Sequence, residues 1–209
     1  MIARGMRSQG SNPFASRHLQ PGAIPFLFRD EQSIEGLADQ ISKARCLRLA
    51  IVGPHGTGKS TLIQQLCERL GCSAIVLHST TPKQVGLMEC MNRVRSGDLC
   101  LIDGYEQLTY WGRGLLVAYA ARRRVKLCAS SHRLPMGFEL IWETKVDHAV
   151  EDHVISRLLV GAEPQVRSAL LESEAWRKSR EKQGENLRES LFDMYDWWRD
   201  TVDELSSHR

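Results

Sequence analysis

The sequence has little that would place it outside the cell or in a membrane. It has six cysteines, and no two of them form a CxxC pair, so neither a disulfide framework nor a zinc site is expected. The first ten residues, MIARGMRSQG, contain no apolar stretch and are not typical of a signal peptide. The apolar run GLLVAYAA at 114–121 is far too short to span a bilayer. These absences predict a reduced, cytoplasmic protein with no membrane partner.

Charge and repetition are also low. The formal net charge is +3, which is too small to imply a nucleic-acid or membrane partner by itself. There is no internal repeat and no low-complexity tract. With 209 residues, the chain is long enough for one α/β domain with a small appendage.

Short apolar segments alternate with amphipathic segments through the middle of the chain. This alternation is typical of a parallel sheet covered by helices on both faces. After residue 163 no strand is expected, and two charged helices should be interrupted near Gly184. Strands are expected at 47–52, 74–77, 99–102, 125–129 and 139–142, and helices at 31–44, from the glycine-rich turn to about 70, at 81–95, about 108–119 and 147–160.

A glycine-rich turn follows the first expected strand. Residues 53–60, GPHGTGKS, fit the pattern G-x-x-x-x-G-K-[ST] in full, with a strand before them and a helix after them. Glycines let backbone N–H groups turn inward around phosphate oxygens, and a helix N-terminus adds positive potential. Lys59 should then reach the β and γ phosphates, and the Ser60 hydroxyl should ligate Mg²⁺. The expected nucleotide-binding residues are Gly53, Pro54, His55, Gly56, Thr57, Gly58, Lys59, Ser60 and Thr61.

The turn is the Walker A motif of P-loop NTPases, and the chain resembles that family from about 47 to 160. The segment 99–108, LCLIDGYEQL, is similar to the Walker B motif, because Asp103 ends an apolar strand. A carboxylate there can hold the water shell of Mg²⁺, although an Asp-Gly turn after a strand is the alternative. The resemblance implies a three-layer α/β P-loop fold with a mostly parallel five-stranded sheet and a helical C-terminal extension. Its expected ligands are ATP and Mg²⁺.

The strand expected at 74–77 lies between the P-loop helix and Asp103. This resembles the additional-strand class of ATPases, which includes AAA proteins and inserts a strand between the Walker A and Walker B strands. Members of the class usually carry a catalytic glutamate directly after the Walker B aspartate, where this chain has Gly104. Glu106 is the nearest carboxylate. It either orients the attacking water or is an acid favoured by the dipole at a helix start.

Polar residues follow the fourth expected strand. In the class that the chain resembles, a polar residue there, called sensor 1, contacts the γ-phosphate or the water. Ser131 and His132 match this role by position, and a polar loop after a strand is the alternative. We therefore take Lys59, Glu106 and Ser131 as the candidate catalytic residues, with Ser60 and Asp103 as the candidate metal ligands.

Two other motifs are typical of proteins that bind GTP or nucleic acid. Residues 144–147, TKVD, resemble the [NT]-K-x-D motif with which GTPases read guanine. Those GTPases also need D-x-x-G after the Walker B strand, and residues 103–106, DGYE, lack the glycine. Residues 122–124, three arginines in a row, are either a solvated helix end or a contact for phosphate or nucleic acid. ATP is therefore favoured over GTP, and nucleic acid has weak support.

Three parts of the chain are expected. Residues 1–29 should form an N-terminal arm that is partly disordered, residues 30–160 the nucleotide-binding domain, and residues 161–209 a helical extension. Within the arm, residues 12–28 are rich in apolar and aromatic side chains. They are expected either to fold over the base side of the nucleotide or to cover an apolar surface of the sheet.

The expected function is ATP binding with slow or partner-controlled, Mg²⁺-dependent hydrolysis of the β–γ bond. One alternative is a non-hydrolysing, nucleotide-dependent interaction module, because Gly104 stands where a glutamate is usual. Another is a small-molecule or nucleotide kinase, which would need an arginine-rich lid, whereas residues 130–138 offer only Arg133. Efficient hydrolysis would require an arginine finger from a protein partner or from a second copy of the chain.

Overall fold

The computed structural model describes residues 12–28, 32–96, 98–162 and 164–207. The chain divides into two compact units, one spanning residues 25–145 and the other combining residues up to 24 with residues from 146 onward. These boundaries differ from the expected ones at 29 and 160. The part of the arm that was expected to be disordered lies outside the described residues.

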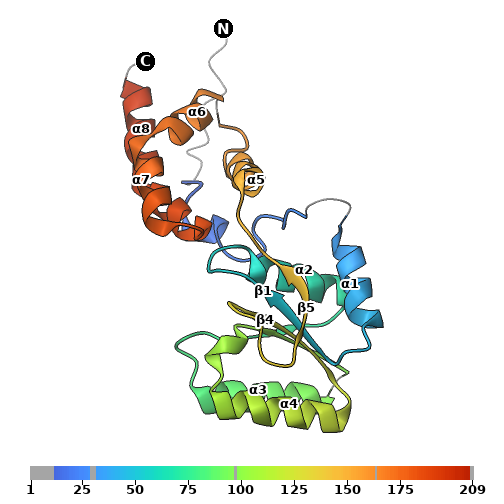
Figure 1. Cartoon of the computed structure of the whole chain (residues 1–209). Helices are drawn as coiled ribbons and strands as arrows, with labels where there is room; N and C mark the ends of the chain where they lie inside the picture. The colour runs from blue at the N-terminus through green and yellow to red at the C-terminus, as the bar shows by residue number, and fades with distance from the viewer. Residues whose placement is uncertain (1–11, 29–31, 97, 163, 208–209) are drawn as a thin grey trace. The chain divides into compact units, whose positions relative to one another are not determined.

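Residues 25–145 form a three-layer α/β unit around a five-stranded sheet (Figure 1). The strand order is β2-β3-β4-β1-β5, and all neighbouring strands are parallel. Helices α1 and α2 pack on one face of the sheet, and α3 and α4 pack side by side on the other. The strands are β1 (Arg48–Val52), β2 (Ala74–Val76), β3 (Leu99–Asp103), β4 (Lys126–Ser131) and β5 (Glu139–Glu143). The helices are α1 (Ile34–Lys43), α2 (Lys59–Leu70), α3 (Lys83–Ser96) and α4 (Tyr110–Arg123).

The two-residue period of the strands explains why helices are needed on both faces. In β1, Leu49 and Ile51 are fully buried against α1 and α2, whereas Ala50 is buried on the side of α3 and α4. In β3, Leu101 likewise faces the first pair of helices, and Ile102 faces the second pair. Strands that are apolar on both faces must be covered twice, and the predicted three-layer α/β fold is confirmed.

Two local boundaries differ from the expected ones, and both affect the site. Strand β4 continues to Ser131, so Ser130 and Ser131 lie inside the strand rather than in a loop after it. Glu106 was expected at the start of the next α-helix but lies in a short 3-10 helix, η2 (Tyr105–Gln107). Helix α4 begins only after Thr109, because the Thr109 hydroxyl accepts a hydrogen bond from the Gly112 N–H at 3.0 Å and so caps the helix.

The second unit is helical, with three helices after residue 163 where two were expected. The extra break falls at Ser173, whose hydroxyl accepts a hydrogen bond from the Trp176 N–H at 3.0 Å and caps a new helix. The expected break near Gly184 is present at the end of that helix. The helices are α5 (His148–Leu158), α6 (Pro164–Glu172), α7 (Glu174–Gln183) and α8 (Leu187–Ser207). No described helix is both long enough and apolar enough to cross a bilayer.

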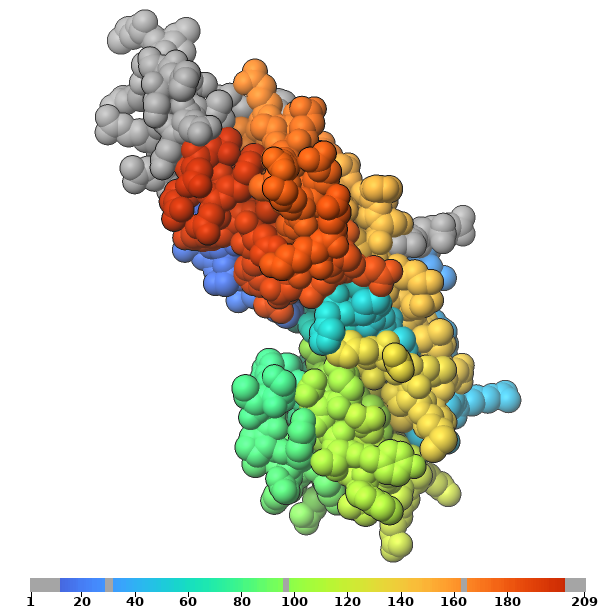
Figure 2. All heavy atoms as spheres, turned by 60° about the vertical axis from the view of Figure 1, so that its left-hand side comes forward, coloured from blue at the N-terminus to red at the C-terminus, as the bar shows by residue number. Residues whose placement is uncertain are grey.

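The arm divides between the two units. Phe14 is fully buried among the C-terminal helices, with its ring edge-on to Trp198 at 6.0 Å, and Figure 2 shows this segment beside those helices. The Asn12 side chain donates to the Tyr195 carbonyl at 2.6 Å. In the sheet unit, Phe26 packs edge-on against Trp142 of β5 at 6.3 Å. Phe14 and Leu19 of the arm therefore belong to the core of the helical unit, whereas Phe26 and Phe28 cover an apolar surface of the sheet unit, which was one of the two expectations for the arm.

Candidate nucleotide-binding site

The glycine-rich turn joins β1 to α2 and adopts a backbone that glycine allows. Gly56 has φ +70° and Gly58 has φ +91°. Residues with a Cβ rarely adopt this left-handed backbone conformation. Gly58 also packs against the arm, because a Cβ on it would lie 3.2 Å from the Phe26 ring. The turn ends directly at Lys59, the first residue of α2. Its backbone N–H groups and the start of the helix are therefore placed together, as an anion-binding turn requires.

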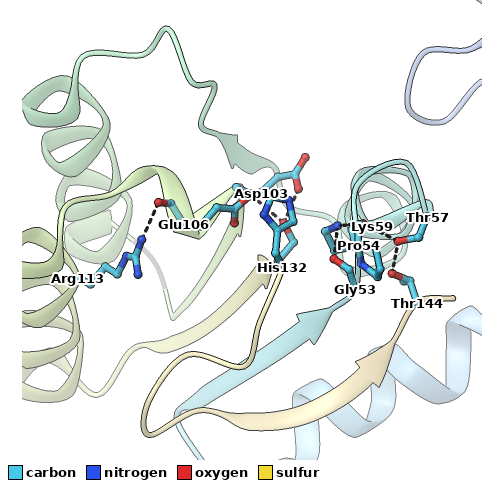
Figure 3. A network of polar contacts seen from close by, with 11 residues as sticks. Gly53, Pro54, Thr57, Lys59, Asp103, Glu106, Arg113, His132 and Thr144 are labelled. Carbon is cyan, nitrogen blue, oxygen red and sulfur yellow. Dashed lines mark hydrogen bonds and ion pairs between the residues drawn. The ribbon is translucent and has the colours of Figure 1, made fainter. Parts of the chain in front are cut away.

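The Lys59 side chain lies on this turn. Its ammonium Nζ donates to the Gly53 carbonyl at 2.7 Å and to the Pro54 carbonyl (Figure 3). Burial lowers the pKa of Lys59, while the nearby carboxylates of Glu106 and Asp103 act in the opposite direction. Lys59 is only 9% exposed, so its ammonium is a buried cation that is held by two carbonyls and lies near two carboxylates. Phosphate oxygens entering this turn would compete with the carbonyls for the ammonium.

Thr144, directly after β5, holds the turn from the side of the sheet. Its hydroxyl lies 2.6 Å from the Thr57 hydroxyl, which also donates to the Pro54 carbonyl at 2.9 Å. A Cβ on Gly53 would lie 2.1 Å from the Thr144 hydroxyl, so only glycine fits there. The hydroxyl of Thr144, the first residue of the TKVD match, is therefore engaged by the glycine-rich turn.

Asp103 ends β3 beside this turn. Its Oδ1 accepts a hydrogen bond from the Ser130 hydroxyl of β4 at 2.5 Å, and the same hydroxyl accepts from the Gly104 N–H at 2.9 Å. Ser130 therefore fixes one oxygen of the Asp103 carboxylate. We did not predict this role for Ser130 from the sequence.

The residues of this region fit a magnesium ion. Asp103 offers a carboxylate oxygen, and Ser60 offers a hydroxyl in the first turn of α2, which are the hard donors that Mg²⁺ prefers. Within the described residues, no group of three or more His, Cys, Asp or Glu side chains is arranged to hold a metal.

Gly104 explains why the usual glutamate is absent after Asp103. Its φ is +84°, and a Cβ at this position would lie 2.5 Å from the Leu77 carbonyl oxygen. The chain therefore crosses the end of β2 too closely for a side chain. The nearest carboxylate, Glu106, comes after this crossing, where η2 turns back toward the site.

Glu106 contacts one of two histidines whose rings lie against each other. Its Oε1 lies 3.3 Å from Nε2 of His132, and the His132 ring lies against the His55 ring, with 3.7 Å between the centroids and 54° between the ring planes. Burial lowers the pKa of His132, the Glu106 carboxylate raises it, and His55 and Lys59 lower it further. The other carboxylate oxygen, Oε2, is buried and has no hydrogen-bond partner among the described residues.

The main chain at Glu106 is held from α4. The Arg113 guanidinium donates to the Glu106 carbonyl at 2.6 Å and to the Leu108 carbonyl at 3.0 Å (Figure 3). The same guanidinium lies over the Tyr105 ring, 5.6 Å from its centroid. We did not predict Arg113 as part of the site, because its contacts are with carbonyls that no sequence motif marks.

Ser131 differs from the other predicted residues. It is buried in β4, and its carbonyl accepts a hydrogen bond from the Gly53 N–H at 3.2 Å, which ties β4 to the start of the turn. His132, the next residue, carries the side-chain contact with Glu106. The structure thus brings Lys59, Asp103 and Glu106 together, and places His132 rather than the Ser131 hydroxyl against the candidate base.

Comparison with known proteins gives one short similarity. No protein-family model matches the chain. A stretch of 38 residues is 53% identical to the ATP-dependent kinase YFH7 of Vanderwaltozyma polyspora, which amounts to 18% of this chain and 11% of that protein. The chain therefore matches only a small part of that relative. Together with the parallel sheet, the match supports a nucleotide-binding fold.

Proposed function

We propose that the protein binds ATP with Mg²⁺ and hydrolyses the β–γ bond, slowly or under the control of a partner. The observation that carries the proposal is the buried Lys59 ammonium, which donates to the Gly53 and Pro54 carbonyls of a glycine-rich turn that ends at a helix N-terminus. The strand order supports the additional-strand class, because β4 pairs with both β1 and β3 and so lies between the Walker A and Walker B strands.

Binding follows from the turn and its lysine. The backbone N–H groups of residues 55–60 would cradle the β-phosphate, and the Lys59 ammonium would exchange the Gly53 and Pro54 carbonyls for phosphate oxygens. Ser60 and Asp103 would hold Mg²⁺, which when bound neutralises charge on the phosphates. Ser130 keeps the Asp103 carboxylate directed at this position.

Hydrolysis requires a base for water, and Glu106 is the candidate. Its free Oε2 would accept a proton from water as the water oxygen bonds to the γ-phosphorus. The bond between the γ-phosphorus and the β–γ bridging oxygen breaks, and the products are ADP and inorganic phosphate. The carboxylate comes from η2 instead of the position next to Asp103, which is why we propose slow turnover until a partner, or a second copy of the chain, supplies an arginine.

A kinase is the second candidate function. It is favoured by the name of the matched protein, and it would transfer the γ-phosphate to the hydroxyl of a small molecule. The loop between β4 and β5 carries a single arginine, Arg133, whereas kinases of the P-loop type need a mobile arginine-rich lid. A nucleotide-dependent interaction module, which binds ATP without turnover, is the third.

Calorimetric titration with Mg·ATP and Mg·GTP, followed by phosphate release on the same samples, separates these functions. We expect ATP to bind, GTP to bind much more weakly, and phosphate to appear. Lys59→Ala should weaken ATP binding about 100-fold, since charge-assisted contacts of about 2–3 kcal/mol are lost. Lys43→Ala, at an exposed lysine of α1, is the matched control. ATP binding without phosphate release would favour the kinase or the interaction module, and a folded protein that binds neither nucleotide would refute the proposal.

A further inference from the structure

We infer that His132 is a positioning residue for Glu106, and that His55 couples this positioning to the phosphate cradle. The inference rests on the proposed ATPase function and names a regulatory contact within the same site. It concerns two side chains, one after β4 and one in the P-loop, that touch each other and lie between the cradle and the candidate base.

The Glu106 carboxylate is held by one oxygen. Oε1 faces His132 Nε2 at 3.3 Å, while Oε2 is buried and has no partner in the described part of the chain. Burying a carboxylate oxygen without a hydrogen-bond partner costs free energy. Such an oxygen is therefore expected where a water molecule or a substrate supplies the missing donor. The contact with His132 therefore presents the other oxygen to the site.

The side chain of Glu106 depends on His132 for its direction. Arg113 fixes the Glu106 carbonyl, but this bond leaves the side-chain torsions of Glu106 free. A glutamate without a partner spreads over several rotamers, which disperses the carboxylate away from a reactive geometry. The contact with His132 restricts the rotamers that the Glu106 side chain can adopt.

Other polar residues at the end of β4 are engaged differently. The Ser130 hydroxyl is used by Asp103 and by the Gly104 N–H, and the Ser131 carbonyl binds the Gly53 N–H. His132 is therefore the residue in this strand end whose side chain reaches Glu106. The groups that face its ring are Glu106 from η2, His55 from the P-loop and Lys59 from α2.

The P-loop contact makes this positioning sensitive to phosphate. His55 follows Gly53 and Pro54, the two residues whose carbonyls hold Lys59. Phosphate oxygens would draw the ammonium away from these carbonyls, and the peptide units that carry His55 would then turn. Because the His55 and His132 rings are in close contact, with their centroids 3.7 Å apart, movement of the first ring is transmitted to the second and so to Glu106.

Kinetics of matched variants test the positioning. We expect His132→Ala to lower kcat about 10–100-fold and to leave the Kd for AMPPNP within about twofold, since an orienting contact acts on the chemical step. His132→Gln, which keeps an N–H donor, should recover part of the loss. Glu106→Gln should lose at least as much, and the double variant His132→Ala/Glu106→Gln should lose no more than Glu106→Gln alone. His78→Ala, an exposed histidine after β2, is the control.

A second measurement tests the coupling without turnover. AMPPNP should shift the imidazole NMR resonance of His132 in the wild-type protein, and His55→Ala should reduce that shift although AMPPNP still binds. Full kcat in His132→Ala, additive losses in the double variant, or an unmoved His132 resonance in a protein that binds AMPPNP would overturn the inference. If the wild-type protein shows the shift of the His132 resonance but releases no phosphate, the coupling is supported and the proposed ATPase function is contradicted.

Discussion

Replacing Gly104 by alanine should destabilise the sheet unit strongly, and replacing it by glutamate should not create a faster ATPase. The glutamate would stand where the additional-strand class usually has its base. In this chain, however, Gly104 has φ +84°, and its Cβ would lie 2.5 Å from the Leu77 carbonyl oxygen. The Leu77 N–H donates to the Asp103 carbonyl at 2.8 Å. A shift of Leu77 that made room for the Cβ would therefore disturb the pairing of β2 with β3.

The magnitude follows from two separate costs. A left-handed backbone costs a residue with a Cβ about 1–3 kcal/mol, and overpacking against a fixed backbone atom costs about 1–3 kcal/mol. Gly104→Ala should therefore lower the free energy of unfolding by about 2–6 kcal/mol, a large part of the about 5–15 kcal/mol of a typical domain. Gly114 is the matched control, because it lies exposed in α4 with nothing within 4 Å of a Cβ, and Gly114→Ala should stabilise by about 1 kcal/mol.

Urea denaturation followed by circular dichroism measures both variants against the wild type. Gly104→Glu should share the loss of stability and should show no gain in phosphate release. If Gly104→Ala unfolds within about 0.5 kcal/mol of the wild type, the close crossing over β2 is not a constraint. Faster hydrolysis by a folded Gly104→Glu variant would mean that the usual base position is accessible, and that Glu106 is not needed in its place.

Two further predictions concern the histidine pair and the arm. Burial lowers the pKa of His132 below its ordinary value of about 6.5 despite the opposing Glu106 carboxylate, and His55 and Lys59 lower it further, so the neutral ring is the main form at pH 7. Turnover should therefore fall only below about pH 6.5, where protonated His132 would make Glu106 a weaker base. The variant His55→Ala removes a group that lowers the pKa of His132. In this variant the fall of kcat on the acid side should move to higher pH. An acid limb that stays in place in the variant would contradict this. Phe14→Ala should lower the stability of the helical unit by about 3–5 kcal/mol, because the ring is fully buried, and should leave the Kd for ATP unchanged. Denaturation and calorimetry on the same samples check it, and a weaker Kd in the folded variant would show that the arm acts on the nucleotide.

The sheet and the P-loop were predictable because their signals are local. Alternation of apolar and amphipathic segments predicted the parallel sheet, and a contiguous motif predicted the turn that carries Lys59. Ser173 shows a local signal that the sequence analysis missed, since a serine before an acidic residue is typical of a helix start. The helix boundary at that point was therefore readable in principle.

The contacts that complete the site were not predictable in the same way. The Thr57 and Thr144 hydroxyls are 87 positions apart, and Ser130 is 27 positions from Asp103. Such pairs depend on which strands become neighbours, and β4 pairs with both β1 and β3 although it follows them in the chain. Ser131 and His132 both matched the expected polar position, but β4 ends at Ser131, and it is the His132 side chain, directly after the strand, that contacts Glu106.

The short β2 strand has a consequence for solubility. It forms one edge of the sheet and has three residues, Ala74–Val76, with Val76 49% exposed. An edge strand offers unpaired N–H and C=O groups to other chains, and a long apolar edge is a site of aggregation. Three residues give an incoming strand too few hydrogen bonds to hold it. The brevity of β2 thus limits the edge-to-edge association that an exposed valine at this position would otherwise favour.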